Sequence, residues 1–218
     1  MALSKLNFNS LNLTPVAGKG IGFDSGADDL EASFSGGAMT FIKKLTASSS
    51  GTLSFVDGAS SVVLDNTYKE YLFLFNNIHP GTDAGRLQIN FSIDSGSNYN
   101  VAKTTTSFRA EHTEADATGL EYTDGFDLAQ GTGFKTISTP CGNDNDQNCV
   151  GILHLFNPSS TTFVKHFICQ TNNYGQGDES SSLFSAGYAN TTSAVDAVQF
   201  KMHDGNIDAG TITLYGIN

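Results

Sequence analysis

The stretch of sequence that most constrains the fold runs from residue 150 to 170, where two apolar segments flank one turn signal. Both segments carry apolar side chains at adjacent as well as alternate positions, so a strand formed by either would be apolar on both faces. This pattern is typical of a strand in the middle of a sheet. Between the segments lies Asn157-Pro158-Ser159-Ser160, which favours a type I turn because proline fixes φ at the second position. We therefore predict a hairpin with its loop at 158–161, which places Ile152 opposite Phe167.

Short apolar runs at strand spacing recur from Met39 to the end of the sequence, and no segment shows the helical period. Turn signals separate these runs. One is Asp57-Gly58, and another is Asp204-Gly205-Asn206, which is expected to join the last two strands as a hairpin. Roughly ten to twelve short strands at regular spacing indicate an all-β fold. We predict an antiparallel two-sheet sandwich of jelly-roll type over residues 39–218.

The inward faces of these strands supply the predicted core. In the run at 86–94, apolar residues alternate with Gln88, Asn90 and Ser92, which predicts one buried and one solvent-facing side. The polar run at 101–112 is expected near a sheet edge. The residues predicted to fill the core are Phe73, Phe75, Phe91, Leu153, Leu155, Phe167 and Leu214.

Residues 1–38 differ from the rest of the chain. Leu6, Phe8, Leu11 and Leu13 have strand spacing, and a glycine- and acid-rich stretch follows them. The segment has too few apolar neighbours of its own to bury these side chains. Two interpretations remain open, a frayed terminus and an extended docking arm that adds a strand to another subunit, and we favour the arm.

The charge balance excludes some classes of partner. The chain carries 22 acidic and 11 basic side chains, which gives a net charge of −11. Phosphate binding needs clustered Lys and Arg, and the only adjacent basic pair is Lys43-Lys44, so we expect no nucleic-acid partner. No apolar run approaches the length of about 20 residues that a membrane span requires. Polar residues interrupt the start of the sequence, which argues against a secretory signal, so we expect a soluble protein with no membrane partner.

The sequence contains no motif that indicates catalysis. Most acids fall in turn signals, which favours solvated turn residues over the paired carboxylates of a glycosidase. His154 and His166 lie on neighbouring predicted strands but lack the spacing of metal ligands. Asn143-Asp144-Asn145-Asp146 offers oxygen ligands for Ca²⁺ without the calcium-loop pattern, and a plain acidic loop is the preferred interpretation. We expect no enzyme activity, no metal and no cofactor.

Cys141 and Cys149 flank seven small or polar residues that are expected to form an exposed loop. A disulfide closing so short a loop would stabilise the fold by roughly 2–3 kcal/mol. A reducing cytoplasm favours free thiols instead, and a metal role is a third alternative. Cys169 is excluded as a partner because strand alternation predicts that it is buried.

Three segments, 42–80, 153–168 and 194–217, contain distinctive phrases, as does the opening MALSKLNFNSLNLTP. These phrases include the Ser-Ser-Gly-Thr start at 49–52, the Asn-Pro-Ser-Ser turn and the closing Gly-x-Ile-x-Leu-Tyr-Gly-Ile at 210–217. In these features much of the chain resembles a family of virion structural proteins of marine tailed bacteriophages. The resemblance implies a non-enzymatic tail-fibre or head-surface protein, and it carries no catalytic motif to any position of this chain.

The expected function is therefore that of a virion surface protein, made in the host cytoplasm and attached by its N-terminal arm. It is expected to form a homo-oligomer, a trimer, and to contact other virion proteins. Head decoration and a tail or fibre role both remain open, although the lack of heptads or a repeating stalk favours a compact protein. The alternative is a carbohydrate- or receptor-binding adhesin module of the tail. Its host glycan would be bound by loop aromatics, for which Tyr99 and Tyr174 are the candidates.

Deletion of residues 1–38 is expected to leave a folded sandwich that no longer joins the particle, because the apolar residues of the arm would be buried on another subunit. Circular dichroism checks the fold, and the amount of truncated protein in purified particles checks docking. Normal incorporation would show that the arm is not the anchor.

Overall fold

The computed structural model describes residues 20–23, 30–34 and 38–218, which belong to two compact units, Met1–Thr40 and Phe41–Asn218. In the first unit, β1 (Gly20–Phe23) pairs antiparallel with β2 (Leu30–Phe34). This part of the predicted extended arm is therefore a two-stranded sheet. The four predicted docking residues, Leu6, Phe8, Leu11 and Leu13, lie outside the described residues.

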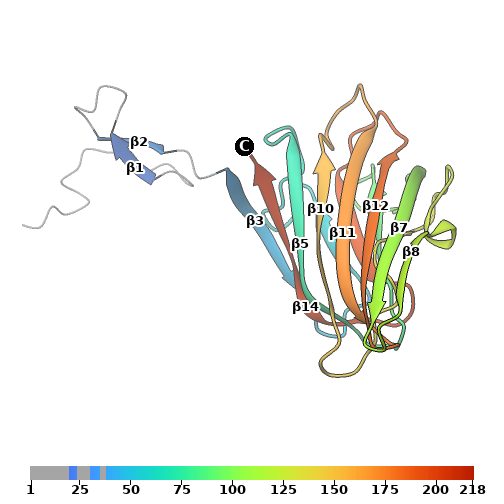
Figure 1. Cartoon of the computed structure of the whole chain (residues 1–218). Coiled ribbons are helices and arrows are strands. Elements are labelled where there is room, and N and C mark those ends of the chain that lie inside the picture. Colours follow the sequence, from blue (N-terminus) through green and yellow to red (C-terminus); the bar gives the residue numbers. More distant parts are fainter. Residues whose placement is uncertain (1–19, 24–29, 35–37) are drawn as a thin grey trace, which may run out of the picture. The chain divides into compact units, whose positions relative to one another are not determined.

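The rest of the chain folds into two antiparallel sheets, which confirms the all-β class and the two-sheet arrangement (Figure 1). The larger sheet has the strand order β3-β14-β5-β10-β11-β12-β7-β8, and the smaller has the order β4-β13-β6-β9. The strands are β3 (Met39–Thr46), β4 (Leu53–Val56), β5 (Glu70–Pro80), β6 (Leu87–Ser92), β7 (Lys103–Thr113), β8 (Thr118–Tyr122), β9 (Lys135–Thr136), β10 (Cys149–Phe156), β11 (Lys165–Gly175), β12 (Glu179–Ala189), β13 (Ala197–Met202) and β14 (Ile207–Ile217). The 3₁₀ turn Asp124–Phe126 follows β8.

An aromatic cluster joins the two sheets in one half of the sandwich. Phe55 on β4 and Phe200 on β13 meet Phe73 and Phe75 on β5, with edge-on ring contacts of 5.3–5.4 Å between centroids. Edge-to-face pairs of buried rings add to the free energy gained by burying their area. All seven residues of the predicted core are 2% exposed or less, so that prediction is confirmed.

The other half of the interior, beneath β11, β12 and β7, is polar. Here the inner face of the larger sheet is covered by the chain between β8 and β10 rather than by long strands. Thr171 donates a hydrogen bond to the carbonyl oxygen of Ile137 (2.7 Å), and Asn173 donates one to that of Pro140 (3.0 Å). Backbone groups of a buried connecting segment need partners, which explains why polar side chains occupy inward positions here.

The central hairpin forms between β10 and β11, but its predicted register is wrong. Ile152 pairs with Gln170, and Leu155 pairs with Phe167. The loop runs from residue 157 to 164 rather than from 158 to 161, because β10 ends at Phe156 and β11 begins only at Lys165. Register depends on loop length, and a turn signal alone does not fix how far the loop extends beyond it.

Other connections also differ from the predictions. The polar stretch at 171–180 is not a long loop, because β11 and β12 extend through most of it. The Asp204-Gly205-Asn206 turn does not close a hairpin, because β13 lies in the smaller sheet and β14 in the larger. The polar side of β6 does not face solvent, since Gln88, Asn90 and Ser92 are buried. In each case tertiary packing overrides a correct local pattern.

Replacing Leu155, which is fully buried, by Ala is expected to lower the free energy of unfolding by about 2–5 kcal/mol through lost burial and a residual cavity. Ile152→Ala is the matched control, because Ile152 lies on the opposite face of β10 and is 38% exposed. Its cost should be clearly smaller. Denaturant titration measures both, and a loss under about 1 kcal/mol for Leu155→Ala would contradict the assigned orientation of the hairpin.

Candidate functional site

Alternation along β10, β11, β12, β7 and β8 divides their side chains between the interior and the outer face of the larger sheet. In β11 the division is regular over residues 165–173, with every odd position buried and every even position exposed. Strand pairing aligns the outward positions in rows. One row contains Ile152, Gln170, Phe184, Phe108 and Tyr122, one residue from each of the five strands.

Apolar side chains dominate these rows. We call the following set the outer apolar face: Phe108, Leu120, Tyr122, Val150, Ile152, Ile168 and Phe184. Leu120 is 76% exposed, Tyr122 56% and Ile168 54%. The rings of Phe108 and Phe184 stack with their centroids 4.9 Å apart. A shallow groove of about 240 Å³ lies beside them, with Ile168 in its opposite wall. Contiguous exposed apolar surface of this kind marks interaction sites.

Charged groups are nearly excluded from this part of the sheet. The outward positions of the five strands hold no Asp, Glu, Lys or Arg, although the chain carries 33 such residues. The neighbouring β5 places one acid, Glu70, at an outward position, where its Oε1 lies 2.5 Å from Nδ1 of His154. His112 and His166 also lie on the outer side of the sheet.

Three of the described lysines are fully buried in the interior, Lys103, Lys135 and Lys165, and the first two have strongly perturbed ammonium groups. Lys103 donates hydrogen bonds to Asn90 Oδ1 (2.5 Å) and to the carbonyl oxygen of Val101 (2.6 Å). Lys135 donates to Ser107 Oγ (2.5 Å) and to the carbonyl oxygen of Phe126 (2.7 Å). Neither forms an ion pair with a described residue. Burial without a compensating carboxylate lowers the pKa of both ammonium groups to about 8.

The cysteines are free thiols in the structure, and all three are 1% exposed. Residues 143–146 between Cys141 and Cys149 are exposed, as expected of this loop, but the expectation that the two thiols are accessible is corrected. Cys141 lies at the start of the loop, where its backbone forms an isolated β-bridge with Gly85. Cys149 is the first residue of β10. Burial raises the pKa of the Cys141 and Cys169 thiols to about 12, which leaves them as unreactive neutral groups.

The other residues singled out from the sequence do not form one site. His154 pairs with Glu70, whereas His166 lies beside Tyr188, with 5.9 Å between the ring centroids. Among the described residues no group of three or more His, Cys, Asp or Glu is placed to hold a metal ion, and residues 143–146 are no exception. Of the two candidate aromatics, Tyr174 lines a groove at one end of the larger sheet, while Tyr99 does not.

Sequence reasoning missed the outer apolar face because it interpreted two-sided apolar strands as buried on both sides. The signal was present in residues 150–156 and 165–170. In a sandwich, however, only one face of each sheet packs on the core, so apolar residues at both parities predict either burial or an exposed interface. The sequence alone does not separate these two outcomes.

No protein-family model matches the chain, and no curated protein or solved structure is similar to it. In the part of the chain that the structure describes, no helix has the length and hydropathy needed to cross a membrane.

The buried lysines predict an unusual dependence of stability on pH. The pKa of Lys103 is about 8 in the folded chain and 10.5 when unperturbed, so the unfolded chain binds more protons between these values and stability rises with pH across that window. A shift of this size corresponds to about 3 kcal/mol at most. Buried thiols act in the opposite direction above about pH 9, so the wild type must be compared with Lys103→Met, in which the thiols are unchanged.

Relative to Lys103→Met, the wild type is expected to gain up to about 3 kcal/mol in free energy of unfolding between pH 7.5 and pH 10.5, as measured by urea titration. Lys44→Met, which removes an exposed lysine, controls for the loss of a cation. If the difference between the wild type and Lys103→Met does not change with pH, the ammonium group of Lys103 is not desolvated.

Proposed function

We propose that this protein is a non-enzymatic structural subunit of a bacteriophage virion surface, made in the host cytoplasm, which assembles with copies of itself through the outer apolar face. The observation that carries the proposal is the contiguous, exposed and charge-free surface over β10, β11, β12, β7 and β8. The assignment to a virion rests on the sequence resemblance to virion structural proteins. The assignment of self-assembly rests on the outer apolar face.

The size of the outer apolar face fits an assembly interface. Five strands about 4.8 Å apart and three rows about 7 Å apart cover about 500 Å² in projection. This is of the order of the ~800 Å² of accessible surface that each partner buries in a standard interface. Burial of this surface removes stacked Phe108 and Phe184 from water, and buried aromatic residues are the side chains that most often dominate binding energy.

Electrostatics favour a second copy as the partner. Two copies, each with a net charge of −11, repel one another over most of their surfaces. The outer apolar face brings no carboxylate of one copy directly against a carboxylate of the other, so it is the surface at which like-charged copies approach at least cost. We propose a trimer, attached to other virion proteins through residues 1–38.

The strand order supports a jelly-roll architecture. The orders β3-β14-β5-β10 and β4-β13-β6-β9 place eight strands in two four-stranded layers, with β11, β12, β7 and β8 extending one layer beyond β10. Jelly rolls recur in viral capsid and lectin domains, which is compatible with this function but does not by itself imply it.

A groove beside the outer apolar face favours a second candidate function, a carbohydrate- or receptor-binding adhesin module of the tail. The groove is lined by Tyr174, one of the two aromatic residues expected to bind glycans. The two functions are compatible in one virion protein, because the groove and the stacked rings occupy different parts of the sheet.

Phe108→Asp and Phe184→Asp are each expected to shift the protein from oligomer to monomer in light scattering coupled to size-exclusion chromatography. Loss of a central aromatic contact costs on the order of 2 kcal/mol or more, which weakens association about 30-fold.

Phe163→Asp is the matched control, since Phe163 is 68% exposed in the loop between β10 and β11 and lies outside the outer apolar face. Circular dichroism should show the same fold for all three variants. A wild type that stays monomeric at high concentration, or a Phe108→Asp variant that assembles like the wild type, would contradict the proposed function.

A further inference from the structure

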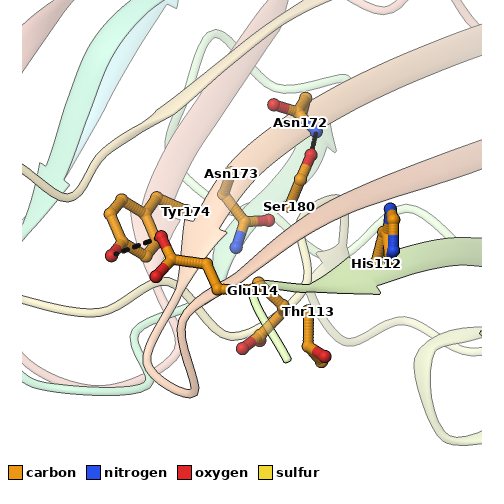
Figure 2. Close-up of a pocket in the computed structure, with 8 residues that line it drawn as sticks. His112, Thr113, Glu114, Asn172, Asn173, Tyr174 and Ser180 are labelled. Atoms are coloured by element: carbon orange, nitrogen blue, oxygen red, sulfur yellow. Dashed lines mark hydrogen bonds between the residues drawn. The ribbon is translucent and has the colours of Figure 1, made fainter. Parts of the chain in front are cut away.

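A groove of about 350 Å³ lies where β7, β11 and β12 end, at the edge of the outer side of the larger sheet (Figure 2). Its wall is polar except for the ring of Tyr174, which lies at one end beside Glu114, while His112 lies at the other. Asn172 and Ser180 lie between them (Figure 2). The volume falls within the range of about 300–1,000 Å³ that is typical of small-molecule sites.

Hydrogen bonds within the groove occupy the donors of Asn172 and Tyr174, whereas the hydroxyl groups of Thr113 and Ser180 accept hydrogen bonds and keep a proton to donate. The Nδ2 group of Asn172 donates to Ser180 Oγ and Ser182 Oγ, both at 3.0 Å, so its Oδ1 keeps its capacity to accept. The hydroxyl group of Tyr174 points to carboxylate oxygens, Asp178 Oδ1 at 3.2 Å and Glu114 Oε1 at 3.4 Å. Its one proton is therefore held inside the protein.

These carboxylates change the chemistry of the tyrosine as well. The hydrogen bond to Asp178, together with some desolvation, raises the pKa of Tyr174 to about 12, so the phenol stays neutral and its ring stays available as an apolar surface. Glu179 adds another acceptor to the wall. The groove thus combines one aromatic ring with carboxylate and amide oxygens and two hydroxyl groups.

A ligand that complements this wall must be rich in hydrogen-bond donors, have an apolar face for the ring and carry no negative charge. A pyranose meets all three conditions, because its hydroxyl groups donate to carboxylates and amide oxygens while its C–H face packs on an aromatic ring. An anionic sugar meets repulsion from Glu114, Asp178 and Glu179, and also from the net charge of −11.

A small cation fits the groove less well than a sugar does. Glu114 and Asp178 both face the hydroxyl group of Tyr174, and the described residues hold no cluster of three His, Cys, Asp or Glu that could hold an ion. Asn172 lies apart from Glu114 (Figure 2), and separated acceptors suit several hydroxyl groups better than one ammonium group.

We propose that this groove is a binding site for neutral carbohydrate, with the ring of Tyr174 stacking on a sugar and Glu114, Asn172 and Glu179 accepting hydrogen bonds from its hydroxyl groups. This inference deepens the second candidate function, the adhesin, and does not depend on self-assembly. It also gives that function a specificity, for uncharged over acidic glycans.

Saturation-transfer NMR and calorimetry with the full chain test the proposal. The probes are neutral trisaccharides (maltotriose, cellotriose and N,N′,N″-triacetylchitotriose), the acidic sugars sialyllactose and trigalacturonic acid, and a lysine tripeptide. At least one neutral trisaccharide is expected to bind saturably, and the acidic sugars are expected to bind at least tenfold more weakly.

Tyr174→Ala is expected to weaken binding of the neutral sugar at least tenfold, whereas Tyr174→Phe, which keeps the ring, should retain most of it. Tyr99→Ala is the matched control, because Tyr99 does not line the groove. Unchanged binding by Tyr174→Ala, preference for the acidic sugars or the lysine tripeptide, or no binding of any neutral probe would each overturn the proposal.

Light scattering on the same samples separates this proposal from the proposed self-assembly. Tyr174→Ala should lose sugar binding and keep the oligomeric state of the wild type. A wild type that assembles but binds no neutral sugar counts against the groove alone, and one that binds sugar as a monomer counts against assembly alone.

Discussion

The fold depends on a mismatch in size between its two sheets. A layer of four strands covers only part of a layer of eight, and the aromatic cluster of Phe55, Phe73, Phe75 and Phe200 marks where the two layers meet. Beyond β10 the inner face must be closed by connecting chain, whose backbone groups need hydrogen-bond partners. Polar residues on the inner sides of β7 and β11 satisfy this requirement, so the interior is apolar in one half and hydrogen-bonded in the other.

Two buried lysines follow from that arrangement. Lys103 on β7 donates to the amide oxygen of Asn90 on β6 and to the carbonyl oxygen of Val101, and no carboxylate is among its partners. Lys135 on β9 donates to Ser107 on β7 and to the carbonyl oxygen of Phe126 in the 3₁₀ turn. Each ammonium group thus joins segments from opposite sides of the interior, at the cost of removing a charge from water. Removal of either ammonium group would leave buried oxygen acceptors without a partner, so both lysines help to hold the interior together in this half of the domain.

The strands that extend the larger sheet also create both candidate functional surfaces. β11, β12, β7 and β8 lie beyond the two four-stranded layers, and their outward positions carry the outer apolar face and, where three of them end, the groove of Tyr174. The inner side of these added strands is covered by the irregular chain between β8 and β10, and their outer side is exposed. One half of the domain therefore has a dry aromatic core, and the other half carries the candidate functional surfaces on its outer side.

By itself, the sequence determined the all-β class, most strand positions and the core, because period-two alternation and turn residues are local signals that burial reinforces. Phe73, Leu153 and Leu214 were assigned to the interior from spacing alone. Tertiary structure decided the rest. The length of the loop after β10 determined which residue pairs with Ile152. The placement of β13 and β14 in different sheets determined that the turn at Asp204 does not close a hairpin. Long-range contacts determined that Asn90 is buried. The outer apolar face also arose only there, since whether a second apolar side is covered depends on how many strands the opposite sheet supplies.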